Sequence, residues 1–289
     1  MPRALTWLDV FTDRPLTGNG LAVVHDADGV SDAAMLAFAR ETRLSETSFV
    51  QSATESAADY RNRIWMTQGE LPFAGHPSLG TAVAVALARG ERSATYTQQT
   101  GVGLQPIEVE AGERVARASM LQEPAAFGAE VEAETALGAL GLDVRDAAPE
   151  LPPQIVGTGL AQLVVPVREA AALDRVAPDA AALRAVLEGP GCVCAYVAFL
   201  DPDRESASAR SFFVEGAAVL EDPATGSAAG PLMAYANART GTARLAIAQG
   251  VAMGRPSRIY ISIDARDGGI TRVRVGGRAV LVGRGELNV

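Results

Sequence analysis

The sequence contains no lysine, and all 25 of its basic residues are arginine. A Schiff base between a lysine amine and a carbonyl group therefore has no residue to carry it. A phosphate-binding P-loop is excluded for the same reason, because its Gly-Lys-Ser/Thr motif requires the lysine ammonium. Pyridoxal phosphate chemistry of the usual kind and P-loop nucleotide hydrolysis thus lie outside what this chain can do.

Cysteine and histidine are also scarce, with two of each among 289 residues. Cys192 and Cys194 alternate through the apolar run 192–199, which predicts a buried strand with both sulfurs packed in the core. His25 lies in a polar turn and is expected to be exposed and without a role, which leaves His76. Two scattered histidines form no ligand cluster, so we expect no metal site.

Long hydrophobic runs and concentrations of basic charge are missing as well. No stretch of about 18 apolar residues is free of charges, which predicts no membrane-spanning helix. The opening Met1-Pro2-Arg3 lacks the apolar core of a signal peptide, so we expect a cytoplasmic protein. The net charge of −9 repels phosphate, and nucleic acid is not an expected partner. The 48% hydrophobic content indicates a globular protein with a substantial core.

The same order of predicted elements occurs twice along the chain. In each half, strands alternate with a first helix, and a glycine-rich turn then opens a second, apolar helix. The predicted helices are 32–39 with Ser31 as N-cap, 79–89 ended by Gly90, 179–187, and a second apolar helix through 232–236. A helix that is apolar nearly all round must be covered on every side. Each half is therefore expected to be a mixed sheet around a central helix.

This repeat predicts an α+β fold with two pseudo-symmetric domains. We place the N-terminal domain at residues 1–120 together with 278–289, and the C-terminal domain at 121–277. Segment 121–153, rich in Ala, Glu, Gly and Pro, is expected to carry the crossover, and strand 278–283 to return to the first half. A single sheet with chance similarity remains the alternative, because Ala-rich sequences align easily.

Glycine-rich segments precede the two apolar helices, at 75–78 and 222–227. A helix N-terminus presents unpaired backbone N–H groups and a partial positive charge, and glycine lets a ligand approach that backbone closely. Either segment alone is more often a plain turn. Because they are paired across a repeat, we interpret them as two parts of one anion site, most simply for a substrate carboxylate.

Three ionisable side chains lie at or near these features. Glu46 begins a predicted strand, where glutamate is depleted, and a surface Glu that caps a turn would explain it as well. His76 lies at the first helix start, where the helix dipole should lower its pKa and favour the neutral imidazole. Asp222 stands before Pro223 at the second helix start and would need no further role as an N-cap.

Five motifs along the chain resemble those of the phenazine-biosynthesis PhzF-like protein family, and they occur in the family's order. They are Gly18-Asn19, Ser45-Glu46-Thr47, the segment 70–77, the segment 221–228, and Gln249-Gly250 with 254–257. They span nearly the whole chain, and the two longer ones are specific. The resemblance implies the diaminopimelate epimerase-like fold, in which two similar domains, each a curved mixed sheet around a central helix, hold the active site in the cleft between them. It also implies a homodimer.

The resemblance further implies a cofactor-independent isomerase that moves a proton between carbons of a small carboxylate-bearing substrate. Glu46 matches the family's catalytic acid/base, and His76 and Asp222 match the polar partners that assist it. The groups that hold the substrate match Asn19, Ser45, Gly75, Gly226 and Ser227. Related epimerases and proline racemases use two cysteines as bases, and no cysteine lies near Gly75 or Thr225 in this sequence. A two-thiol racemase is therefore disfavoured.

The sequence also departs from the family pattern at Gly20, Ser78 and Val214, and these departures bear on the substrate more than on the fold. The alternative function is a non-catalytic protein that senses a small acid or acts through protein contacts. Incorporation of solvent deuterium into carbon of a ligand distinguishes the two, because only an enzyme of this kind exchanges. A metal-dependent hydrolase is disfavoured by the scattered histidines.

Overall fold

The computed structural model describes residues 2–266 and 270–289. The chain forms two compact units, which we describe separately: unit 1 comprises Met1–Leu121 and Gly276–Val289, and unit 2 comprises Gln122–Val275. The sequence predicts divisions after residue 120 and before residue 278. The strand β17 (Ile270–Asn288) crosses the second division, so that one strand belongs to both units.

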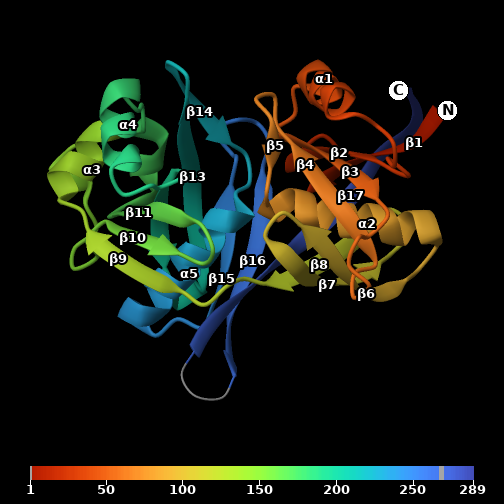
Figure 1. Cartoon of the computed structure of the whole chain (residues 1–289). Coiled ribbons are helices and arrows are strands. Elements are labelled where there is room, and N and C mark those ends of the chain that lie inside the picture. The colour runs from red at the N-terminus through yellow and green to blue at the C-terminus, as the bar shows by residue number, and fades with distance from the viewer. Residues whose placement is uncertain (1, 267–269) are drawn as a thin grey trace. The chain divides into compact units, whose positions relative to one another are not determined.

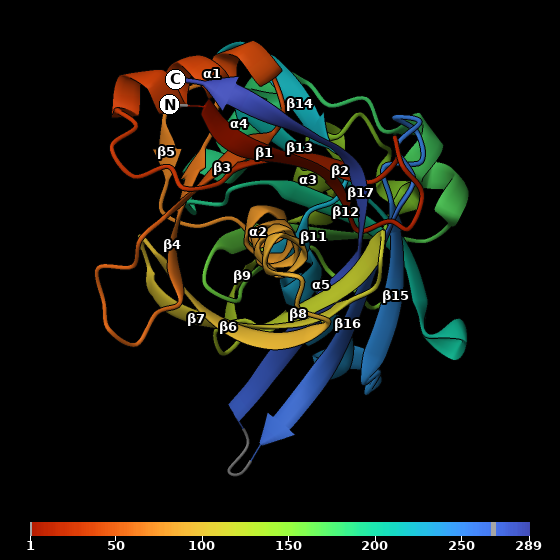
Figure 2. The same ribbon diagram turned by 90° about the vertical axis from the view of Figure 1, so that its right-hand side faces the viewer.

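In unit 1 the strands form a ring around the helix α2 (Gly75–Arg89). They are β1 (Pro2–Val10), β2 (Asn19–Val24), β3 (Glu46–Gln51), β4 (Tyr60–Trp65), β5 (Glu70–Leu71), β6 (Ser93–Thr100), β7 (Gly103–Ala111), β8 (Val115–Leu121) and part of β17. Pairing runs from β1 through β2, β3, β4, β6, β7 and β8 to β17, which pairs with β1 again. Figure 2 shows α2 end-on among these strands.

The buried position of α2 follows from its sequence. Its residues are Ala, Val, Leu, Gly and other small side chains, and the only charge is Arg89 in the last turn, so strands can cover every face. All residues from Gly75 to Ala86 are buried. A Cβ atom at Gly80 would lie 2.5 Å from Leu21 Cδ2, which explains why glycine stands there. The predicted stop at Gly90 is confirmed, with φ of 71° in a left-handed C-cap.

Unit 2 repeats this plan around the helix α5 (Gly226–Thr240), which is labelled with most of the surrounding strands in Figure 1. Its strands are β9 (Ala126–Glu130), β10 (Gln154–Gly157), β11 (Ala161–Val167), β12 (Ala195–Asp201), β13 (Ser206–Glu215), β14 (Ala218–Asp222), β15 (Arg244–Gln249), β16 (Ser257–Arg266) and part of β17. Its other helices are α3 (Ala133–Ala139), α4 (Ala180–Glu188), and the 3-10 turns η1 (Val144–Asp146), η2 (Ala170–Arg175) and η3 (Pro202–Arg204). α5 packs against β10, β11, β12, β15 and β16.

The strand pairings confirm the internal repeat. β2 pairs parallel with β3, and β11 pairs parallel with β12. β4 then pairs antiparallel with β3 and β5 and parallel with β6, and β13 has the same relations to β12, β14 and β15. Each set is followed by an antiparallel pair, β6 with β7 and β15 with β16. The match in order and direction is too extensive for a chance similarity of Ala-rich segments.

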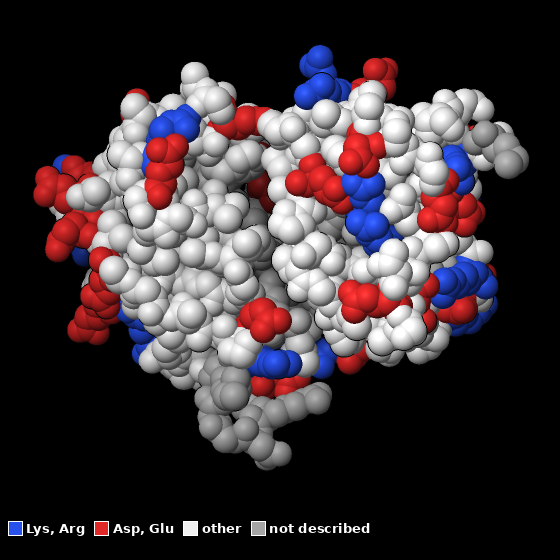
Figure 3. Space-filling model, viewed as in Figure 1, with Lys and Arg blue, Asp and Glu red and all other residues white. Residues whose placement is uncertain are grey.

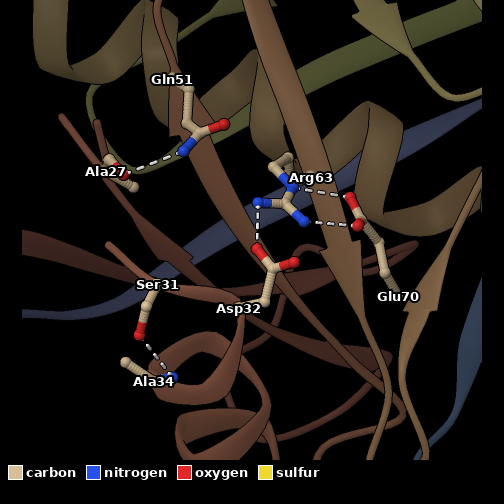
Figure 4. A network of polar contacts seen from close by, with 7 residues as sticks. All are labelled: Ala27, Ser31, Asp32, Ala34, Gln51, Arg63 and Glu70. Atoms are coloured by element: carbon tan, nitrogen blue, oxygen red, sulfur yellow. Dashed lines mark hydrogen bonds and ion pairs between the residues drawn. The ribbon is translucent and has the colours of Figure 1, made fainter. Parts of the chain in front are cut away.

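In unit 1, α1 (Asp32–Thr42) is joined to the strands by an arginine that bridges two carboxylates. Ser31 caps this helix as predicted, accepting from the Ala34 amide at 3.3 Å. Arg63 on β4 donates to both oxygens of Glu70 and, at 2.8 Å, to Asp32 in the first turn of α1 (Figure 4). The helix contributes Met35 to a core cluster that also contains buried residues of β2, β3 and β4.

The structure corrects several sequence-based expectations. α2 begins at Gly75, four residues before the predicted start at 79, so the helix includes Pro77, whose missing N–H falls among those without a helical partner. β12 begins at Ala195, so Cys192 and Cys194 precede the strand, and Cys192 is only half-buried. His25 is buried beside the Thr6 hydroxyl at 2.9 Å, and not exposed.

Charged side chains of both signs are interspersed over the face shown in Figure 3, with red and blue atoms close together and broad areas of neither. Two of the ion pairs that neutralise basic side chains are Arg210 with Glu221 and Arg239 with Glu130. Within 2–266 and 270–289, no helix combines the length and the hydrophobicity that crossing a membrane requires.

Candidate active-site residues in the two units

Four of the predicted site residues come together in unit 1. Asn19 and Glu46 begin β2 and β3, and because these strands are parallel their starts lie at one edge of the sheet. His76, the second residue of α2, places Nδ1 3.2 Å from Asn19 Nδ2 and 3.4 Å from Glu46 Oε2. Ser45 Oγ donates to Asn19 Oδ1 at 3.4 Å. Residues far apart in the sequence thus form one polar cluster at the start of the central helix.

Burial sets the protonation state of His76. The side chain is 4% exposed, and desolvation lowers its pKa from 6.5 to about 3, against a smaller opposing effect of a hydrogen bond with the Gly20 backbone. The direction of this pKa shift agrees with the expected neutral imidazole, and burial is its largest cause. The Nε2 atom is buried and has no hydrogen-bond partner among the residues that the structure describes. It is the ring atom left for a further contact.

Neither central helix has a side-chain cap at its N-terminus. The N-cap of α2 is Ala74, which has no polar side chain, and Gly75 follows it as the first helical residue. The N-cap of α5 is Thr225, whose side chain makes no capping bond. In both helices the first backbone N–H groups are left to other acceptors, as an anion site requires.

In unit 2, Asp222 ends β14 and belongs to a hydrogen-bonded group at the start of α5. Thr225 Oγ1 donates to Asp222 Oδ2 at 2.5 Å, so the carboxylate binds a side chain of the turn and is not the helix N-cap. The Gln249 carboxamide, at the end of β15, contacts both residues: Nε2 donates to the Asp222 carbonyl at 2.8 Å and to Thr225 Oγ1 at 3.0 Å. The turn that carries Asp222 is thereby anchored to the strand beside it.

The first turn of α5, which holds Gly226 and Ser227, is fixed from the start of unit 2. Gln122 Nε2 donates to the Gly226 carbonyl at 2.9 Å, and its Oε1 accepts from Thr158 Oγ1 at 2.6 Å. A Cβ atom at Gly230 would lie only 1.7 Å from Gln122 Oε1. Glycine one turn into the helix therefore makes room for the side chain that holds the helix start.

One cysteine lies closer to the site residues than expected. Cys194 Sγ accepts from Ser211 Oγ at 3.2 Å, and Ser211 pairs with Asp222 across β13 and β14. Burial raises the pKa of the Cys194 thiol to about 12, and the charge of Asp222 acts in the same direction. The thiol is protonated at neutral pH, so the proximity of Cys194 does not make it a base.

Sequence reasoning did not assign a role to Gln249, Gln122 or Thr158. The motif Gln249-Gly250 was noticed only through the family resemblance, although a fully buried glutamine is a signal in its own right, because its amide needs partners. In residues 2–266 and 270–289, no group of three or more His, Cys, Asp or Glu residues could hold a metal ion. The polar groups at the two helix starts are carboxylate, imidazole, hydroxyl and amide groups.

Comparison with known proteins places these residues in a family. Residues 8–285 match the family described as phenazine biosynthesis-like protein, PhzC-PhzF. A trans-2,3-dihydro-3-hydroxyanthranilate isomerase of Pseudomonas chlororaphis is 35% identical over 286 residues, which cover 97% of each chain. The solved structure of a predicted epimerase from Pseudomonas aeruginosa has a TM-score of 0.83 and 37% identity, and the match covers 99% of each chain. These names support an isomerase.

A more distant structure bears on the fold alone. A hydroxyproline epimerase from Agrobacterium vitis matches with a TM-score of 0.64 and 15% identity, over 99% of this chain and 92% of that one. The α+β, epimerase-like fold class expected from the resemblance is confirmed. The chain belongs to the phenazine biosynthesis-like, PhzF-like, protein family.

Proposed function

We propose that this isomerase moves a proton between carbons of a small carboxylate-bearing substrate, with Glu46 as the acid/base and without a cofactor. The observation that carries the proposal is the cluster of Glu46, His76 and Asn19 at the start of α2. Glu46 Oε2 is buried against a neutral imidazole, while the side chain as a whole is 16% exposed, so a ligand can reach the exposed part of this residue. A carboxylate in such partial burial is suited to take up and return a proton.

The roles of the remaining residues follow from the atoms they offer. His76 Nε2, buried and without a partner in the described part of the chain, would contact the substrate and hold it near Glu46. Asp222 would assist the proton transfer as the second acidic group. Asn19, Ser45, Gly75, Gly226 and Ser227 would hold the substrate, with backbone N–H groups on its carboxylate.

The substrate class rests on the named relative and on the helix starts. The Pseudomonas chlororaphis isomerase acts on trans-2,3-dihydro-3-hydroxyanthranilate, according to its name, which makes this compound the first to test. We also propose a homodimer in the cytoplasm, which sedimentation velocity and cell fractionation would test.

The proposed reaction is tested by proton exchange. Wild-type protein is incubated with trans-2,3-dihydro-3-hydroxyanthranilate in deuterium oxide, and turnover and deuterium at carbon are followed by NMR. Glu46→Gln, which keeps the shape but removes the acid/base, should lower kcat by at least about 10²-fold, in line with the usual contribution of a general acid or base. Glu41→Gln, on the exposed face of α1, is the matched control and should retain the wild-type kcat.

The outcomes separate the two candidate functions. Wild-type turnover in Glu46→Gln would refute the role of Glu46. If the wild-type protein binds this compound and other small carboxylic acids but incorporates no deuterium into any of them, the chain is a non-catalytic binder. Turnover of a different acid with deuterium incorporation would keep the reaction type and replace the substrate.

A further inference from the structure

One motif of the sequence, Gln249-Gly250 with Ser257, lies outside the residues assigned to proton transfer or substrate binding. In the structure, hydrogen bonds join this motif to three residues of the turn 222–225, namely Asp222, Pro223 and Thr225. Gln249 bonds the Asp222 carbonyl and the Thr225 side chain, and Ser257 Oγ donates to the Pro223 carbonyl at 2.9 Å. This raises the question of what such a dense set of bonds achieves.

The Gln249 carboxamide uses its full hydrogen-bonding capacity within the protein. Its Oε1 accepts from the Tyr196 hydroxyl at 2.8 Å and from the Thr225 backbone N–H at 3.2 Å. Its two Nε2 protons go to the Asp222 carbonyl and to Thr225 Oγ1. Gln249 and Tyr196 are both fully buried, so a loss of any one of these bonds leaves part of the hydrogen-bonding capacity of a buried group unsatisfied. The amide can therefore adopt only this orientation.

This orientation fixes the direction of the bond to Asp222. Because Gln249 Nε2 donates to Thr225 Oγ1, the threonine hydroxyl has its own proton free to donate, and the acceptor is Asp222 Oδ2 at 2.5 Å. A chain of donors thus runs from Gln249 through Thr225 to the carboxylate, while Tyr196 holds the other end of the amide. No atom of Gln249 needs to touch a substrate for this to work.

Gly250 allows the strand end to lie against the turn. Its φ of 73° is in the left-handed region, and a Cβ atom there would lie 2.6 Å from the Pro223 carbonyl oxygen and 2.4 Å from the Arg255 carbonyl oxygen. Any other residue would push the two backbones apart. Glycine at position 250 therefore allows Gln249 to stay within hydrogen-bonding distance of the turn.

We propose that Gln249, anchored by Tyr196, is a positioning residue that holds the Asp222 carboxylate in its catalytic orientation through the Thr225 hydroxyl. The inference rests on the proposed function in that it takes Asp222 to assist the reaction. It adds that a hydrogen-bond relay, which begins at Tyr196 in β12, fixes the orientation of the Asp222 carboxylate.

Paired variants of the threonine test the relay. Thr225→Val keeps the side-chain shape and removes the hydroxyl. For trans-2,3-dihydro-3-hydroxyanthranilate, kcat should fall about tenfold or more, while KM should change less than about threefold. The reason is that a small misplacement of a reacting group lowers the rate more than it weakens binding. Thr225→Ser restores the hydroxyl and should recover kcat to within about threefold of wild type. Thr240→Val, which removes a hydroxyl bonded at 2.8 Å to the Ala236 carbonyl in the same helix, is the control.

A second pair tests the anchor. Tyr196→Phe removes only the hydroxyl that bonds Gln249 and should lower kcat about threefold or more. Tyr235→Phe removes a hydroxyl with an equally long bond, 2.8 Å to the Pro152 carbonyl, and should leave kcat within twofold of wild type. A general loss of stability would affect both tyrosine variants alike. The difference between them therefore isolates the relay.

Amide exchange measures the relay without any substrate. In the wild-type protein the side-chain NH2 protons of Gln249 should exchange slowly with solvent, and Thr225→Val should speed their exchange about threefold or more while Thr240→Val does not. Rapid exchange of these protons in the wild type would overturn the inference, whatever the substrate proves to be.

The outcomes also separate this inference from the proposed function. If Asp222→Asn lowers kcat but Thr225→Val and Tyr196→Phe do not, the relay is refuted and the role of Asp222 stands. If Asp222→Asn retains the wild-type kcat, the role of Asp222 fails, and with it the positioning role of Gln249, even where slow exchange shows that the bonds exist.

Discussion

Gly230 provides a sharp test of how the first turn of α5 is held. Replacing a helical glycine by alanine usually stabilises a helix by about 1 kcal/mol, because alanine has the higher helix propensity. At Gly230 the added Cβ would lie 1.7 Å from Gln122 Oε1 and 2.9 Å from Thr158 Oγ1. Gln122 must then move, and its bonds to Gly226 and Thr158 are lost or distorted.

The expected magnitude follows from these contacts. Disturbing a buried amide with two hydrogen bonds costs about 1–3 kcal/mol for each group left unsatisfied, and overpacking adds a similar amount. Subtracting the propensity gain leaves a net destabilisation of about 3 kcal/mol for Gly230→Ala. With an m-value of about 1–3 kcal/mol per M urea, the midpoint of unfolding should fall by about 1 M or more.

Urea unfolding followed by far-ultraviolet circular dichroism measures this change. Gly138→Ala in α3 is the control, because this glycine is exposed and a Cβ atom there would meet nothing within 4 Å. Its midpoint should stay level or rise. Combining Gln122→Ala with Gly230→Ala should cost less than the sum of the single changes, because the clash is removed. A wild-type midpoint for Gly230→Ala, or strictly additive costs, would refute the steric argument.

Three further predictions concern other residues. Burial holds the pKa of His76 near 3, below its unfolded value of about 6.5, so the native state binds fewer protons than the unfolded state. The free energy of unfolding should therefore fall by about 2 kcal/mol between pH 7 and pH 5. The urea midpoint of His76→Asn should fall less over the same interval. Cys194→Ala should retain kcat, and Cys194 in native protein should resist iodoacetamide at pH 7.5, since its thiol pKa is about 12; rapid labelling or lost turnover would contradict its inert role. Arg63→Met should lower the free energy of unfolding by about 1 kcal/mol through lost bonds to Glu70, and an unchanged urea midpoint would show that this partly buried ion pair contributes nothing.

Much of the fold could be predicted from the sequence because the signals were local or repeated. Ser31 before a periodic run indicated the start of α1, and Gly90 indicated the end of α2. The apolar composition of α2 and α5 indicated central helices, because neither helix has a polar face to expose to solvent. Element boundaries were less accurate where two structures compete, as at Cys194, which lies in a loop although its neighbours alternate like a strand.

The arrangement of the site residues was less accessible. Glu46 and His76 are 30 positions apart, and only the parallel pairing of β2 with β3 shows that Asn19 and Glu46 share an edge with the start of α2. The role of Gln249 depends on four bonds to residues between 24 and 53 positions away, which no local pattern encodes. Expectations for Glu46, His76 and Asp222 as catalytic residues came from the family resemblance and remain predictions.

The strand β17 has a consequence for how the protein is made. Residues 279–288 of β17 pair with β1 in unit 1, yet the ribosome reaches them only after it has translated all of unit 2. Unit 2 is one continuous segment of the chain, Gln122–Val275. The ring of strands around α2 in unit 1, in contrast, cannot close until Gly276–Val289 emerges from the ribosome. During synthesis β1 therefore presents an unpaired edge for the time that more than 150 residues take to be translated. The domain that begins the chain is the one that finishes folding second.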